Sequence, residues 1–317
     1  MDLFFPTPTI RRCFMYLLAA MSRRYNIGIV AYAMMPNHIH IIVNPGLDPS
    51  RPFDLPEFKK QLLANFSKIV NKIWDRNGHV MCRDSTGDCI RIVDDPAELQ
   101  QISYVECNGV AKGYGRRPED LDGAVSMRRW LTNPIAVSRP QIYFQEQKWA
   151  DQEVLRLCVP KLHAGRGHNA ATFQKLSQER LLKDLRRVRR VVKKAGKPVL
   201  RLRDLESRIP VHKNESSAAD HSCAHIVGQD KARKAAEYHN LRAFWAWHAD
   251  ALRRLKEGEE DVLFPPGTYK AVQKYGARVA SHEYFRAKLR RRDRPRANNP
   301  FELGRAKKSR RSVTQLE

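Results

Sequence analysis

The chain has 317 residues, enough for a sizeable hydrophobic core and for one large or two ordinary domains. Its 58 Lys and Arg outnumber 34 Asp and Glu and give a formal charge of +24, which makes a polyanion the expected partner. Nucleic acid is favoured over an anionic membrane surface, and a solvated basic surface is the remaining alternative. Six cysteines without a C-x-x-C or framework spacing indicate reduced thiols in a cytoplasmic protein.

The N-terminal part of the sequence predicts a helix followed by two strands. Apolar residues at three- and four-residue spacing predict a helix over 10–25. Its apolar segment 13–21 is flanked by arginines, but it is too short to span a bilayer, so we expect no membrane partner. The β-branched run 27–33 and the segment 38–43 predict strands joined by the turn pair Pro36-Asn37.

The next elements complete an α+β pattern. A helix is expected from about 55 to 74, then short strands near 79–83 and 89–93. This order is typical of an antiparallel sheet covered by helices. A further helix is predicted over 96–109, with Asp95 as N-cap and Glu98 closing a capping box.

The sequence changes character from about residue 150 onward, where helical patterns and basic runs dominate. Residues 180–194 predict an amphipathic helix with a positive outer face, and 232–256 predict a second helix. Residues 212–231 are polar and small, as in a linker, and the charged tail over 286–317 is expected to be disordered. The cations expected to contact DNA phosphates are Lys183, Arg186, Arg187, Arg190, Lys193, Lys194, Arg290, Arg291 and Arg292.

One pair of histidines suggests chemistry. His38 and His40 lie at i and i+2 of a predicted strand, so both imidazoles point to one face and can chelate one divalent ion. The alternative is two histidines on a half-exposed strand face without a ligand. A well-held ion needs more ligands than two imidazoles.

The helix predicted over 96–109 offers further groups at the right spacing. Tyr104 and Asn108 are four residues apart and therefore share one helix face. An Asn oxygen suits a hard ion such as Mg²⁺ or Mn²⁺. A phenol is a poor nucleophile at neutral pH, yet beside such an ion and a positioned phosphate it can attack phosphorus.

The segment "MPNHIHIIV" and the later helix with "YVECN" resemble the single-tyrosine HUH transposases of the IS200-like and REP-associated type. The signature of that family is His-hydrophobic-His on a strand and Tyr-x-x-x-Asn or Tyr-x-x-x-Gln on a helix. The stretch from Ser103 to Gly123 is similar to the tyrosine-helix segment of the family, and "FPPGTY" at 264–269 is similar to the C-terminal region of one subgroup.

The resemblance implies an activity and a set of roles. Tyr104 would attack a scissile phosphate of hairpin-ended single-stranded DNA and form a 5′-phosphotyrosine intermediate for strand transfer. His38, His40 and Asn108 would hold Mg²⁺ or Mn²⁺. The protein would act in the bacterial cytoplasm at the nucleoid, as a monomer or a homodimer. The family would place a ferredoxin-like nuclease domain at 1–145 and leave 146–317 as a basic, mainly helical region.

The sequence departs from the pattern of the family at two places. Gly109 stands where the family usually has proline, which would loosen the helix end, and residues 1–7 leave no room for the strand that precedes the first helix. We therefore expect unpaired strand backbone beside the histidines. A non-catalytic nucleic-acid-binding descendant is the alternative function, and a replication initiator or relaxase is disfavoured because the histidines precede the tyrosine.

Other candidate residues are weaker. Tyr114 is the second choice of nucleophile, although its glycine neighbours indicate a flexible loop, and Glu106 is expected to be an exposed carboxylate. The His and Cys residues of 221–225 indicate a solvated loop rather than a metal site, and the histidines of 163–168 indicate no function. The aromatic residues of 244–247 fit core packing better than stacking on bases.

Overall fold

The computed structural model describes residues 7–78, 80, 89–121, 123–201, 204 and 226–293. The chain forms two compact units, residues 1–235 and 236–317, and each is described by itself. The first unit therefore runs past residue 145, where the sequence had suggested a boundary. The α+β class is confirmed, but the described strands form four two-stranded ladders, so the ferredoxin-like sheet stays a prediction.

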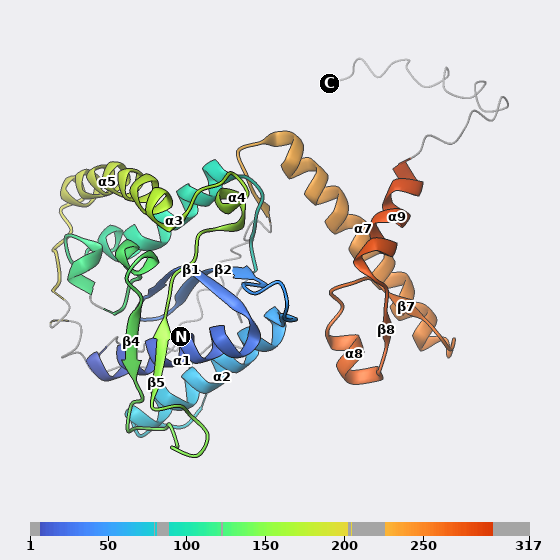
Figure 1. Ribbon diagram of the computed structural model, residues 1–317, viewed down its shortest axis with the longest axis horizontal. Helices are drawn as coiled ribbons and strands as arrows, with labels where there is room; N and C mark the ends of the chain where they lie inside the picture. The colour runs from blue at the N-terminus through green and yellow to red at the C-terminus, as the bar shows by residue number, and fades with distance from the viewer. Residues whose placement is uncertain are drawn as a thin grey trace, which may run out of the picture. The chain divides into compact units, whose positions relative to one another are not determined.

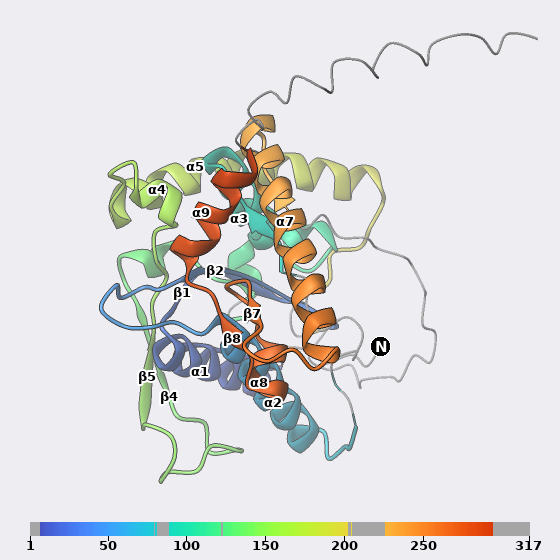
Figure 2. The same ribbon diagram turned by 90° about the vertical axis from the view of Figure 1, so that its right-hand side faces the viewer.

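The first unit is built around a β-hairpin held between helices. Strand β1 (Ile27–Met34) pairs antiparallel with β2 (Ile39–Pro45), close to the two predicted strands. Helices α1 (Pro8–Tyr25) and α2 (Leu55–Ile73) cover one face of the hairpin, and α3 (Asp95–Ala111) covers the other (Figure 1). Figure 2 shows the same layers from the side. Every residue of β1 is buried, so this strand forms the centre of the core.

A β-bulge interrupts the hairpin at Val30. Ile29 lies opposite Val43 and Ala31 lies opposite Ile42, so Val30 has no partner across the ladder. A bulge of this kind leaves one residue unpaired and bends the strand locally.

The two outer edges of the hairpin differ. The free edge of β1 is covered: the amide of Met34 donates to the carbonyl of Ala124, and the amide of Cys158 donates to the carbonyl of Ile29. Within the described residues β2 pairs with β1 alone, so its second edge has no strand partner there.

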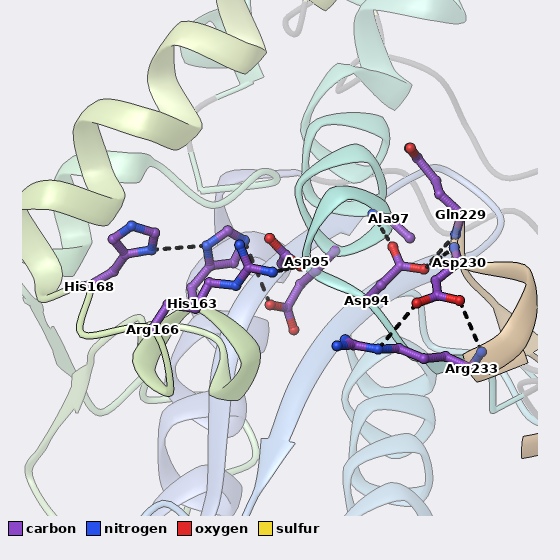
Figure 3. Close-up of polar contacts among 10 residues, drawn as sticks. Asp94, Asp95, Ala97, His163, Arg166, His168, Gln229, Asp230 and Arg233 are labelled. Carbon is purple, nitrogen blue, oxygen red and sulfur yellow. Dashed lines mark hydrogen bonds and ion pairs between the residues drawn. The ribbon is translucent and has the colours of Figure 1, made fainter. Parts of the chain in front are cut away.

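Helix α3 begins one residue earlier than predicted. Asp94, not Asp95, is the N-cap, and its carboxylate accepts hydrogen bonds from the amides of Ala97, Gln229 and Asp230 (Figure 3). The predicted capping box is therefore wrong, because Glu98 no longer stands at the required third position.

Glu98 instead belongs to a buried polar cluster near the start of α3. Its Oε2 lies 3.9 Å from Nε2 of His163, and Nδ1 of His163 lies 3.1 Å from Nδ1 of His168. Arg166 reaches from the same loop to Asp95, at 2.8 Å (Figure 3). The histidines of 163–168, which indicated no function from sequence, thus fix the loop before α5 against α3.

Gly113, not Gly109, ends helix α3: its φ is +86°, its amide donates to the carbonyl of Val110, and the amide of Tyr114 donates to the carbonyl of Gly109. The helix continues through Gly109 to Ala111, with Lys112 as C-cap. A Cβ atom on Gly109 would come within 2.2 Å of Leu121 Cδ1, so the missing side chain lets the 3₁₀ turn η1 (Pro118–Leu121) pack closely. Gly109 is thus a packing residue inside the helix.

The rest of the first unit extends beyond residue 145. Strands β4 (Ile135–Ser138) and β5 (Gln152–Leu155) form an antiparallel ladder beside α1, and the 3₁₀ turn η2 (Arg128–Leu131) precedes them. The short α4 (Lys161–Ala164) leads to α5, which spans Ala170–Lys194 and so starts ten residues before the predicted helix. Leu181 and Leu185 of α5 pack on Cys107 and Val110 of α3.

Part of the linker expected over 212–231 packs against the first unit. Residues 205–225 lie outside the described part, as does most of the strand expected near 79–83. Residues Ile226–Val227 form β6, which pairs in parallel with β3 (Arg91–Ile92). Together with the Asp94 contacts, this ladder ties residues 226–230 to the first unit, so that part of the linker prediction is wrong.

The second unit has a small core of its own. Helix α7 (Lys231–Lys256) crosses into it, followed by β7 (Leu263–Phe264), α8 (Lys270–Tyr275), β8 (Arg278–Val279) and α9 (His282–Asp293). Trp247 stacks on Phe285 at 13° with 5.8 Å between ring centroids, and its indole N–H donates to Leu263 O at 2.9 Å. Residues 286–293 are helical, so the prediction of a disordered tail is wrong over that range.

Candidate functional site

The two histidines meet on one face of the hairpin. His38 immediately precedes β2, and His40 lies opposite Ala33 of β1. Their ring centroids are 4.7 Å apart with the planes at 85°, so the imidazoles touch edge to face. This confirms the expectation that both side chains share one face.

The ring of His38 is oriented by its neighbour in the turn. Nδ1 of His38 lies 2.7 Å from Oδ1 of Asn37, an atom that can only accept, so Nδ1 carries the proton. The lone pair of Nε2 then remains available. An outer carbonyl that fixes the tautomer in this way is a common support for a metal-binding histidine.

His40 has a buried nitrogen without a partner. Its Nε2 is shielded from solvent and makes no hydrogen bond to any described residue. Burial, with a smaller effect from His38, lowers the pKa of His40 to about 4, and burial with the nearby Lys112 charge lowers the pKa of His38. Both imidazoles are therefore neutral near pH 7, the form that binds a metal.

Tyr104 stands against this pair. Its ring centroid is 5.8 Å from that of His40, with the planes at 75°, and the side chain is 55% exposed. An exposed phenol beside two neutral imidazoles is open to a ligand approaching from solvent. The sequence prediction that strand and helix bring these three residues together is confirmed in position.

Two further residues follow Tyr104 at helical spacing. Asn108 lies one turn later and is only 4% exposed, and within the described part no hydrogen bond joins its side chain to either imidazole. Lys112 lies another turn on, and its charge acts on His38. Sequence analysis missed Lys112, although the spacing 104, 108, 112 was a signal that could have found it.

A buried ion pair holds α3 in place. Glu106 is 1% exposed, which overturns the expectation of a surface carboxylate, and its Oε1 accepts from Nε of Arg128 at 2.5 Å. Burial raises the pKa of Glu106 against the opposing effect of Arg128. Arg128 also donates to the carbonyl of Val30 at 2.9 Å, so one guanidinium connects α3 to the bulge of β1.

The donor set defines what could be bound here. Within the described ranges no group of three or more His, Cys, Asp or Glu side chains is arranged to hold a metal ion. An ion at this site would rely on His38, His40, the Asn108 oxygen and oxygens from a substrate or water. Both imidazoles are neutral. Nε2 of His40 has no hydrogen-bond partner, and Nε2 of His38 has its lone pair available, so both atoms could donate to such an ion.

The predicted DNA-contacting cations whose side chains the structure describes are exposed to solvent. The six side chains on α5 are all exposed and recur every three or four residues along one helix face: Lys183, Arg186, Arg187, Arg190, Lys193 and Lys194. Arg290, Arg291 and Arg292 lie in α9 of the second unit, and their side chains are outside the described part.

The structure places the remaining candidate residues in different environments. Tyr114 is half-buried and forms a β-bridge with Leu200, so the flexible-loop interpretation is wrong. The His and Cys residues of 221–225 lie outside the described residues. Trp247 is a core residue of the second unit, as expected, whereas Trp245 is 57% exposed.

Comparison with known proteins adds no relative. No family model matches the chain, and no match was found among curated proteins or solved structures. None of the described helices is both long and apolar enough to cross a bilayer.

Proposed function

We propose that this protein is a metal-dependent strand transferase for single-stranded, hairpin-ended DNA, with Tyr104 as nucleophile. The observation that supports the proposal most directly is that the exposed Tyr104 ring contacts His40, which in turn contacts His38. A phosphate placed over this pair would meet the phenol from the solvent side. Lys112 adds a positive charge on the same helix face, near His38.

The reaction is a transesterification. The Tyr104 oxygen bonds to phosphorus, the bond from phosphorus to the 3′ oxygen breaks, the phenolic proton leaves to solvent and the departing 3′ oxygen gains a proton. A bound Mg²⁺ or Mn²⁺ would stabilise charge on the phosphate oxygens, and His38, His40 and Asn108 are the residues that would hold it. His38 and Asn37 orient the site, and the Glu106–Arg128 pair fixes the helix that carries the nucleophile.

The chemistry dictates a label-specific test. The enzyme would keep the 5′ phosphate of the downstream fragment, so a label at the 3′ end of a hairpin oligonucleotide should migrate with the protein on a denaturing gel. A 5′ label should be released instead. The substrate is a pool of hairpins with randomised single-stranded flanks, with Mg²⁺ or Mn²⁺. Tyr104→Phe should abolish the adduct, while Tyr275→Phe, a tyrosine of similar exposure in the second unit, should leave it unchanged.

The second candidate is a nucleic-acid-binding protein without catalysis. The six exposed cations of α5 favour it as strongly as they favour the transferase. It predicts salt-sensitive DNA binding and no adduct with any divalent ion. An adduct that survives Tyr104→Phe would contradict the assignment of the nucleophile.

A further inference from the structure

A cationic cavity lies where the ends of α3 and α5 meet, within the first unit. Its volume is about 630 Å³, within the range of small-molecule sites, ~300–1,000 Å³. Five cationic side chains line it: Arg116, Arg117, Arg189, Lys193 and Lys197. No carboxylate lines it, and among the described residues none of these five cations forms an ion pair.

The loop that carries the two arginines is preorganised. Asp120 Oδ2 accepts the backbone amides of Arg116 and Arg117 at 2.7 and 3.0 Å. Nε of Arg189 donates to the carbonyl of Arg116 at 2.8 Å, which ties the loop to α5. The carboxylate that could have neutralised the arginines is thus engaged with backbone.

The cavity also has an apolar side. Val110 of α3, Val192 of α5 and Val199 of the following segment contribute to its wall. A neighbouring hollow of about 550 Å³ shares Gly115, Arg116 and Val199 and adds both Arg201 and the carboxylate of Asp120. Positive and apolar walls together suit a group that has both a phosphate and a flat apolar ring.

The helix dipole explains only part of this arrangement. A lysine at the end of α5, such as Lys193, is stabilised by the helix carbonyls without any ligand. Arg116 and Arg117 lie in the loop after α3, outside the last turn of either helix, so the helix dipole does not explain why their charges are placed beside the cavity. Lys193 also belongs to the exposed basic face of α5, which makes that face and the cavity continuous.

We propose that this cavity binds one unstacked nucleotide of single-stranded DNA, with its base against the valines and its phosphates on Arg116 and Lys193. The choice of DNA as the ligand rests on the proposed function. A single strand is the form that fits, because its bases are free to leave the stack, whereas those of a duplex are paired and stacked.

The charge side of the proposal is tested with a fluorescent dT 12-mer and the full-length protein. Arg116→Ala/Lys193→Ala should weaken binding about tenfold at moderate salt, and the slope of log K against log salt should shrink by about 1.4, at about 0.7 per lost contact. Lys68→Ala/Lys72→Ala removes the same charge from an exposed face of α2 and should change binding much less. Equal effects of the two pairs would overturn the site.

The apolar side is tested without changing charge. Val199→Trp fills the cavity and should weaken binding about tenfold with an unchanged salt slope, since no phosphate contact is lost. Val191→Trp, on an exposed part of α5 that does not line the cavity, is the matched control. Identical binding by both variants would overturn the base-binding side.

The two proposals can fail separately. Cavity-dependent binding with no adduct from the wild-type protein would refute the transferase and keep the site. An adduct that forms while binding ignores both cavity variants would refute the site and keep the transferase.

Discussion

Glu106 and Tyr104 are two residues apart on α3 and lie in opposite environments: the first is fully buried against Arg128, the second is exposed beside His40. The helix therefore has one residue that anchors it to the sheet and one that faces solvent over the histidines. This relationship makes the position of the phenol depend on a salt bridge that no substrate touches.

Removal of one partner of that salt bridge should be costly. Glu106→Leu leaves Arg128 buried without a counter-charge and should reduce the free energy of unfolding of the first unit by about 3–5 kcal/mol. Urea denaturation followed by circular dichroism measures the loss. Glu106→Leu/Arg128→Met should recover most of it, because the isolated charge is gone, whereas Glu179→Leu, at an exposed position of α5, should have little effect.

Metal binding should depend on the turn residue as well as on the imidazoles. His40→Ala should abolish Mn²⁺ binding measured by titration calorimetry, because one nitrogen cannot chelate. Asn37→Ala should weaken it about 10–100-fold, since the tautomer and orientation of His38 are no longer fixed. His282→Ala, an exposed histidine of the second unit, is the control. Unchanged Mn²⁺ affinity in His40→Ala would remove the ion from this site.

Stability of the first unit should depend on pH through Glu98. Burial, with a smaller effect of Asp95, raises the pKa of Glu98 to about 7. A raised folded-state pKa means a contribution that is complete below the unfolded pKa near ~4.5 and is lost as pH rises to about 7, worth about 1–3 kcal/mol.

Glu98→Gln should therefore flatten the fall in melting temperature between pH 5 and pH 7.5. The neighbouring His163 acts in the opposite sense, because burial lowers its pKa and its contribution is lost as pH falls. Glu179→Gln should retain the wild-type profile. A Glu98→Gln profile that parallels the wild type would show that the pKa of this carboxyl is the same in the folded and unfolded states.

The exposed face of α5 should contribute binding energy without sequence preference. Lys183→Ala/Arg187→Ala/Arg190→Ala removes three phosphate contacts and should reduce the salt slope for single strands by about 2. The loss should be equal for oligonucleotides of different sequence, because phosphate contacts carry no base information. Anisotropy titrations at several salt concentrations measure both quantities, and a loss confined to one sequence would contradict the assignment.

Local patterns were sufficient for the elements with strong periodicity. Helices α1, α2 and α7 and the β1–β2 hairpin follow from the spacing of apolar residues and from Pro36-Asn37. Strand geometry places His38 and His40 on one face, whereas their meeting with Tyr104 was implied by the family resemblance. The N-cap of α3 could not be decided locally, because both Asp94 and Asp95 precede Pro96. The amides of Gln229 and Asp230, distant in sequence, select Asp94.

The burial of Glu106 had no sequence signal either. Its partner Arg128 comes from a 3₁₀ turn that covers the edge of β1, a tertiary contact that periodicity does not encode. The same holds for the cavity beside α5, which needs the loop after α3 to fold back on Leu200.

The unpaired residue of β1 has a consequence for which side chains lie beneath α3. Beyond Val30 the alternation of the strand changes phase, so Gly28, Ala31 and Ala33 all lie opposite even-numbered residues of β2, on the His40 side. The large residues Ile29 and Tyr32 are thereby collected on the side of α1. If Val30 instead paired with Ile42 in a regular ladder, Ala31 would lie opposite Ile41 and Tyr32 opposite His40, which would turn the phenol ring of Tyr32 toward the helix that carries the proposed nucleophile. The bulge at Val30, a residue without a ladder partner, thus keeps small side chains beneath the helix that carries Tyr104.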